Sequence, residues 1–284
     1  MDLMLNYALI AALMYALPFV LSDSLSKRMI SKIGAYKLGT LMLAVGLAPT
    51  IIASVFVGFG TISLSVVLLA IITGMAISFG YMLFYKAMET EQISNSIALS
   101  ELASVLFVIF GFVVFGEAIG IMGAIGAAIV FIGAGLVAIT EDLKFNKKLI
   151  PAIFAFATWS GGFIIFAYSI KSSGTFAIPL VMARITALIS FFLIARVVGL
   201  KNTRSKTCNH IKGIAATGLL DGIGTVGFGF ATMLTAVGLA GVMNAVMPVI
   251  AAIIGYKYYK ERFTKLQLFG FTIMVIGAVV VSIS

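Results

Sequence analysis

The sequence predicts an all-α membrane protein with ten transmembrane helices, arranged as two inverted five-helix repeats around a central cavity. Three observations predict this fold: the composition, a repeat within the chain and the distribution of basic residues. The 284 residues are 62% hydrophobic and 10% charged, with a mean hydropathy of +1.18. Because soluble domains carry about 25% charged residues, this composition indicates a chain that lies in a lipid bilayer.

Ten apolar stretches are long enough to cross a bilayer, since about 20 helical residues span a hydrocarbon core of roughly 30 Å. They are residues 3–22, 36–57, 64–86, 92–116, 119–140, 149–170, 175–198, 211–236, 238–257 and 264–283. Little of the chain lies outside them, so we expect no soluble catalytic domain. The first stretch is preceded by Asp2 rather than by a basic residue, so we do not expect a cleavable signal.

The second half of the chain repeats the first at an offset of 144 residues. Gly74 and Gly80 recur as Gly218 and Gly224, and 16 of the 67 positions between residues 73 and 139 are identical to their counterparts. Internal repeats in a membrane chain are typical of folds with a site at the repeat interface. We therefore predict two repeats, residues 1–143 and 144–284, that together form one domain.

Basic residues gather on one side of the predicted membrane. In the first half they follow the first and third spans, whereas in the second half they follow the second and fourth, so equivalent loops face opposite sides. Two repeats with an odd number of spans must be inverted when they are joined in series. The positive-inside rule places the basic loops in the cytoplasm and both termini outside an inner or plasma membrane. This distribution, rather than nucleic-acid binding, accounts for the net charge of +9.

The chain offers few residues for metal or covalent chemistry. Cys208 is its only cysteine and His210 its only histidine, which excludes an intrachain disulfide and provides too few ligands for a metal site. No nucleophile–base set stands out either. We therefore expect no cofactor, no metal and no enzymatic activity.

Three charged residues are predicted to lie deep inside spans, where charges usually face a cavity or a partner. Arg184 and Asp221 lie at comparable depth on consecutive spans, so they form either a structural ion pair or part of a cavity wall in which Arg184 binds a carboxylate. Glu101 has no evident basic partner, and burial favours its protonated form. It is therefore either a proton or cation carrier or a protonated, hydrogen-bonded core residue. Asn244, next to the position equivalent to Glu101, makes the predicted cavity asymmetric.

Aromatic residues on three spans are candidates for the wall of the cavity. Tyr15 and Trp159 occupy equivalent positions in the two repeats, and Tyr81 shares one helix face with Tyr85. Such walls suit amphipathic or cationic ligands, although packing or interfacial anchoring explains the same pattern. The predicted ligand-binding set is Tyr15, Tyr81, Trp159, Arg184, Asp221 and Asn244.

Several stretches resemble motifs of the drug/metabolite transporter superfamily, in its EamA-type ten-helix branch. They are Phe-Ala-Thr-Trp-Ser-Gly-Gly-Phe at residues 156–163, Met-Ala-Arg-Ile-Thr-Ala-Leu at residues 182–188, and the matched series Glu117, Gly126, Gly133 and Glu261, Gly270, Gly277. The first repeat departs from the family pattern, because Tyr15 and Thr40 stand where the second repeat has Trp159 and Arg184. The family usually keeps both termini in the cytoplasm, opposite to the orientation that the charges predict.

The resemblance implies a secondary transporter that moves a small organic solute by alternating access, with export as the usual direction. The mixture of acid, base and aromatic residues is compatible with amino acids or similar metabolites, and coupling to protons would involve Glu101. Two alternatives remain: an uptake carrier for an organic cation, in which Asp221 locks Arg184, and a passive channel. We expect a small-molecule substrate, a surrounding lipid bilayer, no nucleic acid and a monomer or homodimer.

Overall fold

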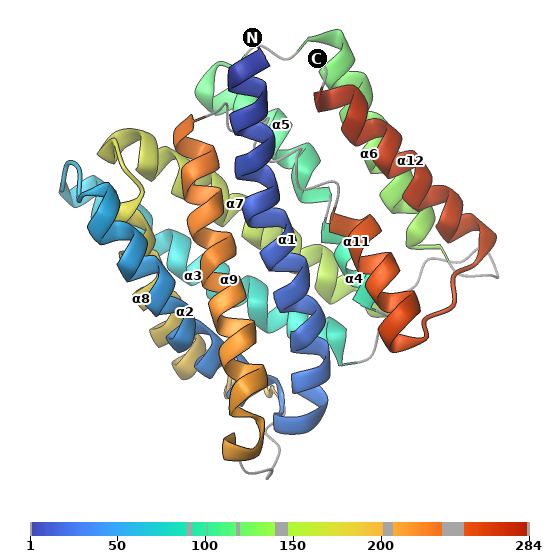
Figure 1. Cartoon of the computed structure of the whole chain (residues 1–284), viewed down its shortest axis with the longest axis horizontal. Helices are drawn as coiled ribbons and strands as arrows, with labels where there is room; N and C mark the ends of the chain where they lie inside the picture. Colours follow the sequence, from blue (N-terminus) through green and yellow to red (C-terminus); the bar gives the residue numbers. More distant parts are fainter. Residues whose placement is uncertain are drawn as a thin grey trace.

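A computed structural model describes residues 2–89, 93–100, 102–117, 120–139, 147–200, 207–234 and 247–282. Almost all of these residues are helical (Figure 1). Six long helices form one group: α1 (Asp2–Ile33), α2 (Ala35–Val57), α3 (Leu64–Met88), α7 (Ile150–Ser173), α8 (Ala177–Ile194) and α9 (Ile211–Leu234). The other helices are α4 (Ile93–Ser100), α5 (Leu102–Phe115), α6 (Ile121–Val137), α11 (Met247–Ile254), the π-helix η4 (Gly255–Tyr259) and α12 (Lys265–Ser282), with short 3₁₀ turns η1 (Lys147–Leu149) and η2 (Thr207–His210).

Within the described residues, five helical segments are long and apolar enough to cross a membrane. They are Ala35–Val57, Leu64–Met88, Ile150–Ser173, Ala177–Ile194 and Thr207–Leu234. Helices also occupy parts of the other predicted spans, but α6 and α12 are shorter apolar helices. Many large apolar side chains point outwards, including Phe56 at 84% exposure and Ile121 at 81%. Exposed apolar surface on this scale suits contact with lipid rather than with water.

The first helix is longer than the sequence analysis predicted. α1 continues to Ile33, about three turns beyond the predicted end at residue 22. Lys27, Arg28 and Lys32 therefore lie on the last turns of α1 and not in a loop. No glycine or proline interrupts residues 19–33, and Gly34, with φ of 84°, then takes a conformation that favours glycine and separates α1 from α2.

The main contacts between long helices have counterparts in the other half of the chain, at positions shifted by 144 residues. α1 packs along α9 and α3 packs along α7, while α2 contacts α9 and α3 contacts α8. The offset relates α1 to α7, α2 to α8 and α3 to α9, so each of these contacts has its counterpart in the other half. α2 with α8 and α6 with α12 are contacts between equivalent helices. Figure 1 shows α6 and α12 side by side, apart from the group of long helices.

Glycines allow α6 and α12 to approach closely. A Cβ atom added to Gly133 would lie 2.7 Å from the carbonyl oxygen of Gly270, and one added to Gly277 would lie 2.8 Å from that of Gly126. The offset relates Gly126 to Gly270 and Gly133 to Gly277, so these two contacts are also counterparts. Small residues at such crossings let helix backbones touch in the membrane, where the hydrophobic effect does not drive helices together.

We predict that Gly133→Ala destabilises the protein by about 1–3 kcal/mol, because the new methyl group overlaps the backbone of α12. Gly135→Ala is the matched control, since no atom lies within 4 Å of the Cβ position there. Thermal unfolding in detergent measures both variants. Equal melting temperatures for the two variants would show that α6 and α12 do not pack as described.

Candidate functional site

The carboxylate of Asp221 lies at the centre of a buried polar cluster that joins three helices. One of its oxygens, Oδ1, accepts a hydrogen bond from the hydroxyl of Tyr81 on α3. The other, Oδ2, accepts from Nη2 of Arg184 on α8. Asp221 itself is on α9, and its backbone oxygen accepts from the hydroxyl of Thr225 at 2.8 Å. The cluster thus connects a helix of the first half to two helices of the second.

Burial makes this pairing necessary. Asp221 is 1% exposed and Arg184 is 4% exposed. An isolated charge at such a position would lose its hydration without compensation, whereas a hydrogen-bonded pair of opposite charges retains most of the lost interaction. The hydroxyl of Tyr81 donates a hydrogen bond to the carboxylate oxygen that Arg184 does not contact, so both oxygens of Asp221 have partners. The pair is therefore electrically neutral when Arg184 and Asp221 are both charged.

Glycines make room for the guanidinium group. A Cβ atom at Gly46 on α2 would overlap Arg184, so any larger residue there would displace the guanidinium. Gly222 follows Asp221 on α9, and a Cβ atom there would lie 2.6 Å from the carbonyl oxygen of Gly46. Close contact between α2 and α9 thus depends on Gly46 and Gly222. The sequence analysis did not identify Gly46, although a glycine inside a predicted span is a recognisable signal of close helix packing.

A small cavity adjoins Arg184 in the part of the chain that the structure describes. Its volume is about 10 Å³, and its lining residues are Ile77, Phe166, Leu180, Ala183, Arg184, Ala187 and Thr225. That volume corresponds to about one water molecule, so an organic solute does not fit in this small cavity. Nε of Arg184 is buried and has no hydrogen-bond partner among the described residues. The guanidinium therefore retains one donor that a ligand could use.

A second tyrosine extends the cluster towards α1. The rings of Tyr81 and Tyr85 are 5.7 Å apart, and Tyr85 is fully buried. The hydroxyl of Tyr85 lies 2.9 Å from Sδ of Met42 and 3.5 Å from Oγ of Ser26 on α1. Polar groups thus continue from Asp221 through two tyrosines to Ser26, in the C-terminal half of α1.

The sequence analysis missed Asp23, which also belongs to this region. It lies on α1 between buried Ser22 and Ser24, and its charge interacts unfavourably with that of Asp221. Its position just after the predicted end of the first span suggested a loop. The absence of any glycine or proline between residues 19 and 33 was the signal that could have placed Asp23 inside the helix.

The structure separates the predicted aromatic residues into two groups. Trp159 lies beside Tyr81, with ring centroids 4.9 Å apart, and its indole nitrogen donates to the carbonyl oxygen of Ile77 at 3.1 Å. Tyr15 is 1% exposed and packs edge-on against Phe228 at 5.6 Å. Tyr81, Trp159, Arg184 and Asp221 therefore come together, while Tyr15 lies in an adjacent aromatic layer. Glu101 and Asn244 lie outside the described residues.

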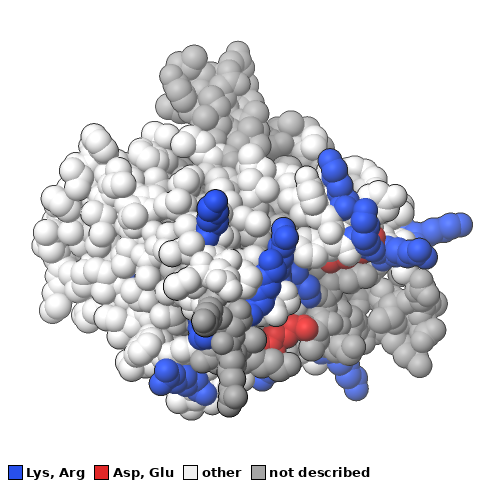
Figure 2. Space-filling model, turned by 60° about the horizontal axis from the view of Figure 1, so that its bottom comes forward, with Lys and Arg blue, Asp and Glu red and all other residues white. Residues whose placement is uncertain are grey.

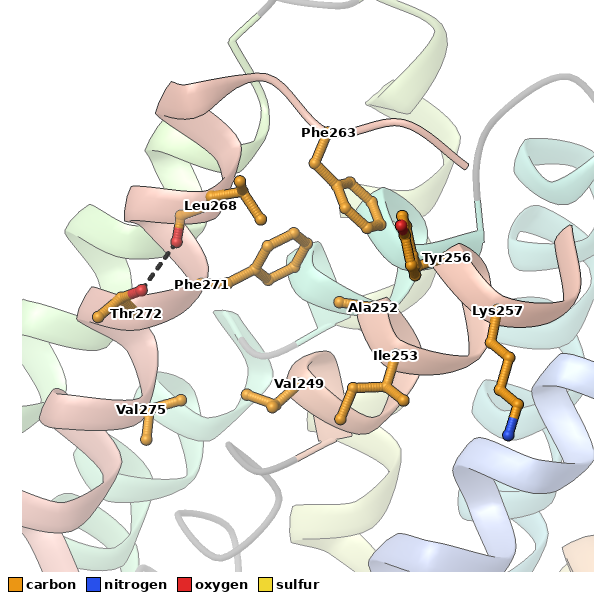
Figure 3. Close-up of a pocket in the computed structure, with 10 residues that line it drawn as sticks. All are labelled: Val249, Ala252, Ile253, Tyr256, Lys257, Phe263, Leu268, Phe271, Thr272 and Val275. Carbon is orange, nitrogen blue, oxygen red and sulfur yellow. Dashed lines mark hydrogen bonds between the residues drawn. The ribbon is translucent and has the colours of Figure 1, made fainter. Parts of the chain in front are cut away.

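A larger pocket exists elsewhere, but its lining does not suit a polar solute. It lies between α11, η4 and α12, has a volume of about 540 Å³ and is lined almost entirely by apolar side chains (Figure 3). The hydroxyl of Thr272, one of its few polar groups, already donates to the backbone oxygen of Leu268 at 2.9 Å. The Asp221 cluster is therefore the better candidate for recognition of a charged or polar ligand.

Comparison with known proteins identifies the family. The model of the EamA-like transporter family matches residues 4–139 and again residues 146–283. The chain belongs to the EamA-like transporter family. Arg184 and Asp221 lie in the middle parts of α8 and α9, two helices of this multi-pass membrane protein that are long and apolar enough to cross a membrane. The two matches correspond closely to the two halves that the sequence repeat defines.

Solved structures support the same fold. One, titled only "Crystal structure of protein", has a TM-score of 0.71 and 16% sequence identity, and the alignment covers 98% of this chain and 97% of the other. At this identity the similarity concerns the fold alone. No curated protein matches the chain.

We predict that Asp221→Asn destabilises the protein by about 3–5 kcal/mol, because Arg184 then stays charged and buried without a carboxylate. The double variant Arg184→Met/Asp221→Leu should recover most of this loss, since apolar residues of similar volume often replace a buried ion pair without cost. Thermal unfolding of the three proteins in detergent checks this. A double variant as unstable as Asp221→Asn would contradict the ion-pair explanation.

Proposed function

We propose that this EamA-like transporter is a secondary active transporter that moves an amino acid or a similar zwitterionic metabolite by alternating access. The observation that carries the proposal is the buried cluster of Arg184, Asp221 and Tyr81. A neutral, buried pair of opposite charges is what a carrier for a zwitterion requires. Export is the proposed direction, with both termini outside.

A zwitterion can replace the internal pair without leaving a buried charge uncompensated. Its carboxylate would bind the guanidinium of Arg184, whose planar group holds carboxylates through two hydrogen bonds. Its ammonium group would bind Asp221, and Trp159 and Tyr81 would contact its apolar part. Arg184 and Asp221 would each exchange the other for a group of the substrate with the same charge. Separating the pair would therefore leave neither ion buried without a partner.

Alternating access follows from the proposed inverted repeats. The exchange of helix contacts under the 144-residue offset supports this arrangement, because a two-fold relation between repeats requires each contact to have a counterpart. The glycine contacts between α6 and α12 obey the same rule. Rocking of one half against the other would open the Asp221 cluster to each side of the membrane in turn.

Proton or cation coupling is proposed for Glu101, with Asp23 as a second carboxylate near the cluster. Asp23 interacts electrostatically with Asp221, Tyr81 and Tyr85, so its protonation would alter the charge balance of the site. Carboxylates inside membrane helices that gain and lose protons are the usual carriers of coupling in transporters.

We predict that the Arg184→Met/Asp221→Leu variant folds but transports no amino acid, because it lacks both groups that bind a zwitterion. A thermal-shift screen of amino acids, choline and nucleosides against the wild type first identifies a ligand. Counterflow of that radiolabelled ligand in proteoliposomes then compares wild type and variant. Full transport by the double variant would refute the proposed site.

The same assay distinguishes the alternatives. Binding of choline but not of amino acids would favour the organic-cation carrier, in which Arg184 stays locked by Asp221. Flux without counterflow would indicate a channel. Glu101→Gln and Asp23→Asn, each assayed with an imposed pH gradient, identify the residue that carries the proton. The variant that lacks this residue should accumulate no substrate. Unchanged proton-driven accumulation in Glu101→Gln would remove Glu101 from the mechanism.

A further inference from the structure

A basic pocket lies where the last turns of α1 meet the beginning of α9. It has a volume of about 360 Å³, and its lining residues are Leu25, Arg28, Met29, Lys32, Cys208, Asn209, His210, Ile211, Lys212 and Gly213. Three of these residues are permanent cations and none is acidic. The extension of α1 beyond its predicted end creates this pocket, because Arg28 and Lys32 project from an ordered helix and not from a loop.

The pocket belongs to the basic end of the molecule. Figure 2 turns the molecule so that the bottom of Figure 1 comes forward. In this view, many Lys and Arg side chains lie on the visible surface. The base of the pocket is fixed by close packing, since a Cβ atom added to Gly213 would lie 2.6 Å from Sδ of Met29. α1 and α9 therefore hold Arg28, Lys32 and Lys212 around one opening.

An apolar pocket adjoins the basic one on the other side of α1. Its volume is about 480 Å³, and it is lined by Leu21, Ser24, Leu25, Arg28, Ile254, Tyr258 and Tyr259. The two pockets share Leu25 and Arg28. The hydroxyl of Tyr259 donates to the backbone oxygen of Ser24, which joins η4 to α1 along this pocket. A ligand that contacts both pockets would meet the cations of the first and the mostly apolar surface of the second.

We propose that these two pockets bind one anionic phospholipid of the leaflet at the basic end. The phosphate would lie among Arg28, Lys32 and Lys212, and an acyl chain would lie along Leu21, Leu25 and Ile254. The charge of the lining excludes a cationic ligand, and the apolar extension distinguishes a lipid from free phosphate. Basic pockets between membrane helices at the cytoplasmic side bind anionic headgroups by the same combination of charge and burial.

The single cysteine of the chain provides a direct test. Cys208 is exposed and lines the basic pocket. We expect phosphatidylglycerol, added to the wild-type protein in neutral detergent, to slow maleimide alkylation of Cys208, whereas phosphatidylcholine should not. Equal protection by the two lipids would overturn the proposal. Equal protection by inorganic phosphate would overturn the assignment to a lipid and indicate a free-anion site.

Charge removal gives an independent measurement. Lipid binding by native mass spectrometry should weaken about fivefold for each cation removed in Arg28→Gln, Lys32→Gln and Lys212→Gln. Lys86→Gln is the matched control, because Lys86 is an exposed cation on α3 that lines neither pocket. Undiminished affinity for phosphatidylglycerol in the three variants would contradict the site. The alkylation experiment tests the proposal even if a variant does not fold, since it uses the wild-type protein.

Discussion

A buried carboxylate in a membrane must have its charge compensated, and the interior of this protein is arranged around that constraint. Asp221 receives hydrogen bonds from Arg184 and Tyr81, and so ties α9 to α8 and α3. To contact Asp221, the side chain of Arg184 passes α2 at Gly46, where a Cβ atom would overlap it. Gly46 also packs closely against Gly222 on α9. One electrostatic requirement thus determines where four long helices approach each other and which positions must be glycine.

The scaffold is repeated, but its chemistry is not. The positions equivalent to Arg184 and Asp221 in the first half are Thr40 and Ile77, which carry no charge. Tyr81 and its counterpart Thr225 both donate to Asp221, one to the carboxylate and one to the backbone. A solute in the proposed cavity would therefore meet ionic groups from the second half and a phenol from the first. This asymmetry lets a repeated fold orient a substrate whose two ends differ.

The sequence predicted the long apolar helices and the depth of Arg184 and Asp221, because these depend on composition and on helical rise alone. It did not predict that Tyr81 would reach Asp221 or that Tyr15 would pack in a separate aromatic layer, since both depend on how helices rotate about their axes. The end of α1 was placed at residue 22 because Lys27 and Arg28 were interpreted as a loop. Charged residues are compatible with helix once it leaves the hydrocarbon, and that misplacement concealed Asp23.

The central claim is that two inverted units meet around the Arg184–Asp221 pair, and cysteine accessibility in sealed cells tests it most directly. Leu64 is the counterpart of Cys208 at the 144-residue offset, and both side chains are exposed. The wild type and a Cys208→Ser/Leu64→Cys variant would be labelled with a membrane-impermeant maleimide. The inverted arrangement predicts that position 64 is labelled from outside and position 208 only after the cells are opened. Labelling of both positions from the same side would contradict it.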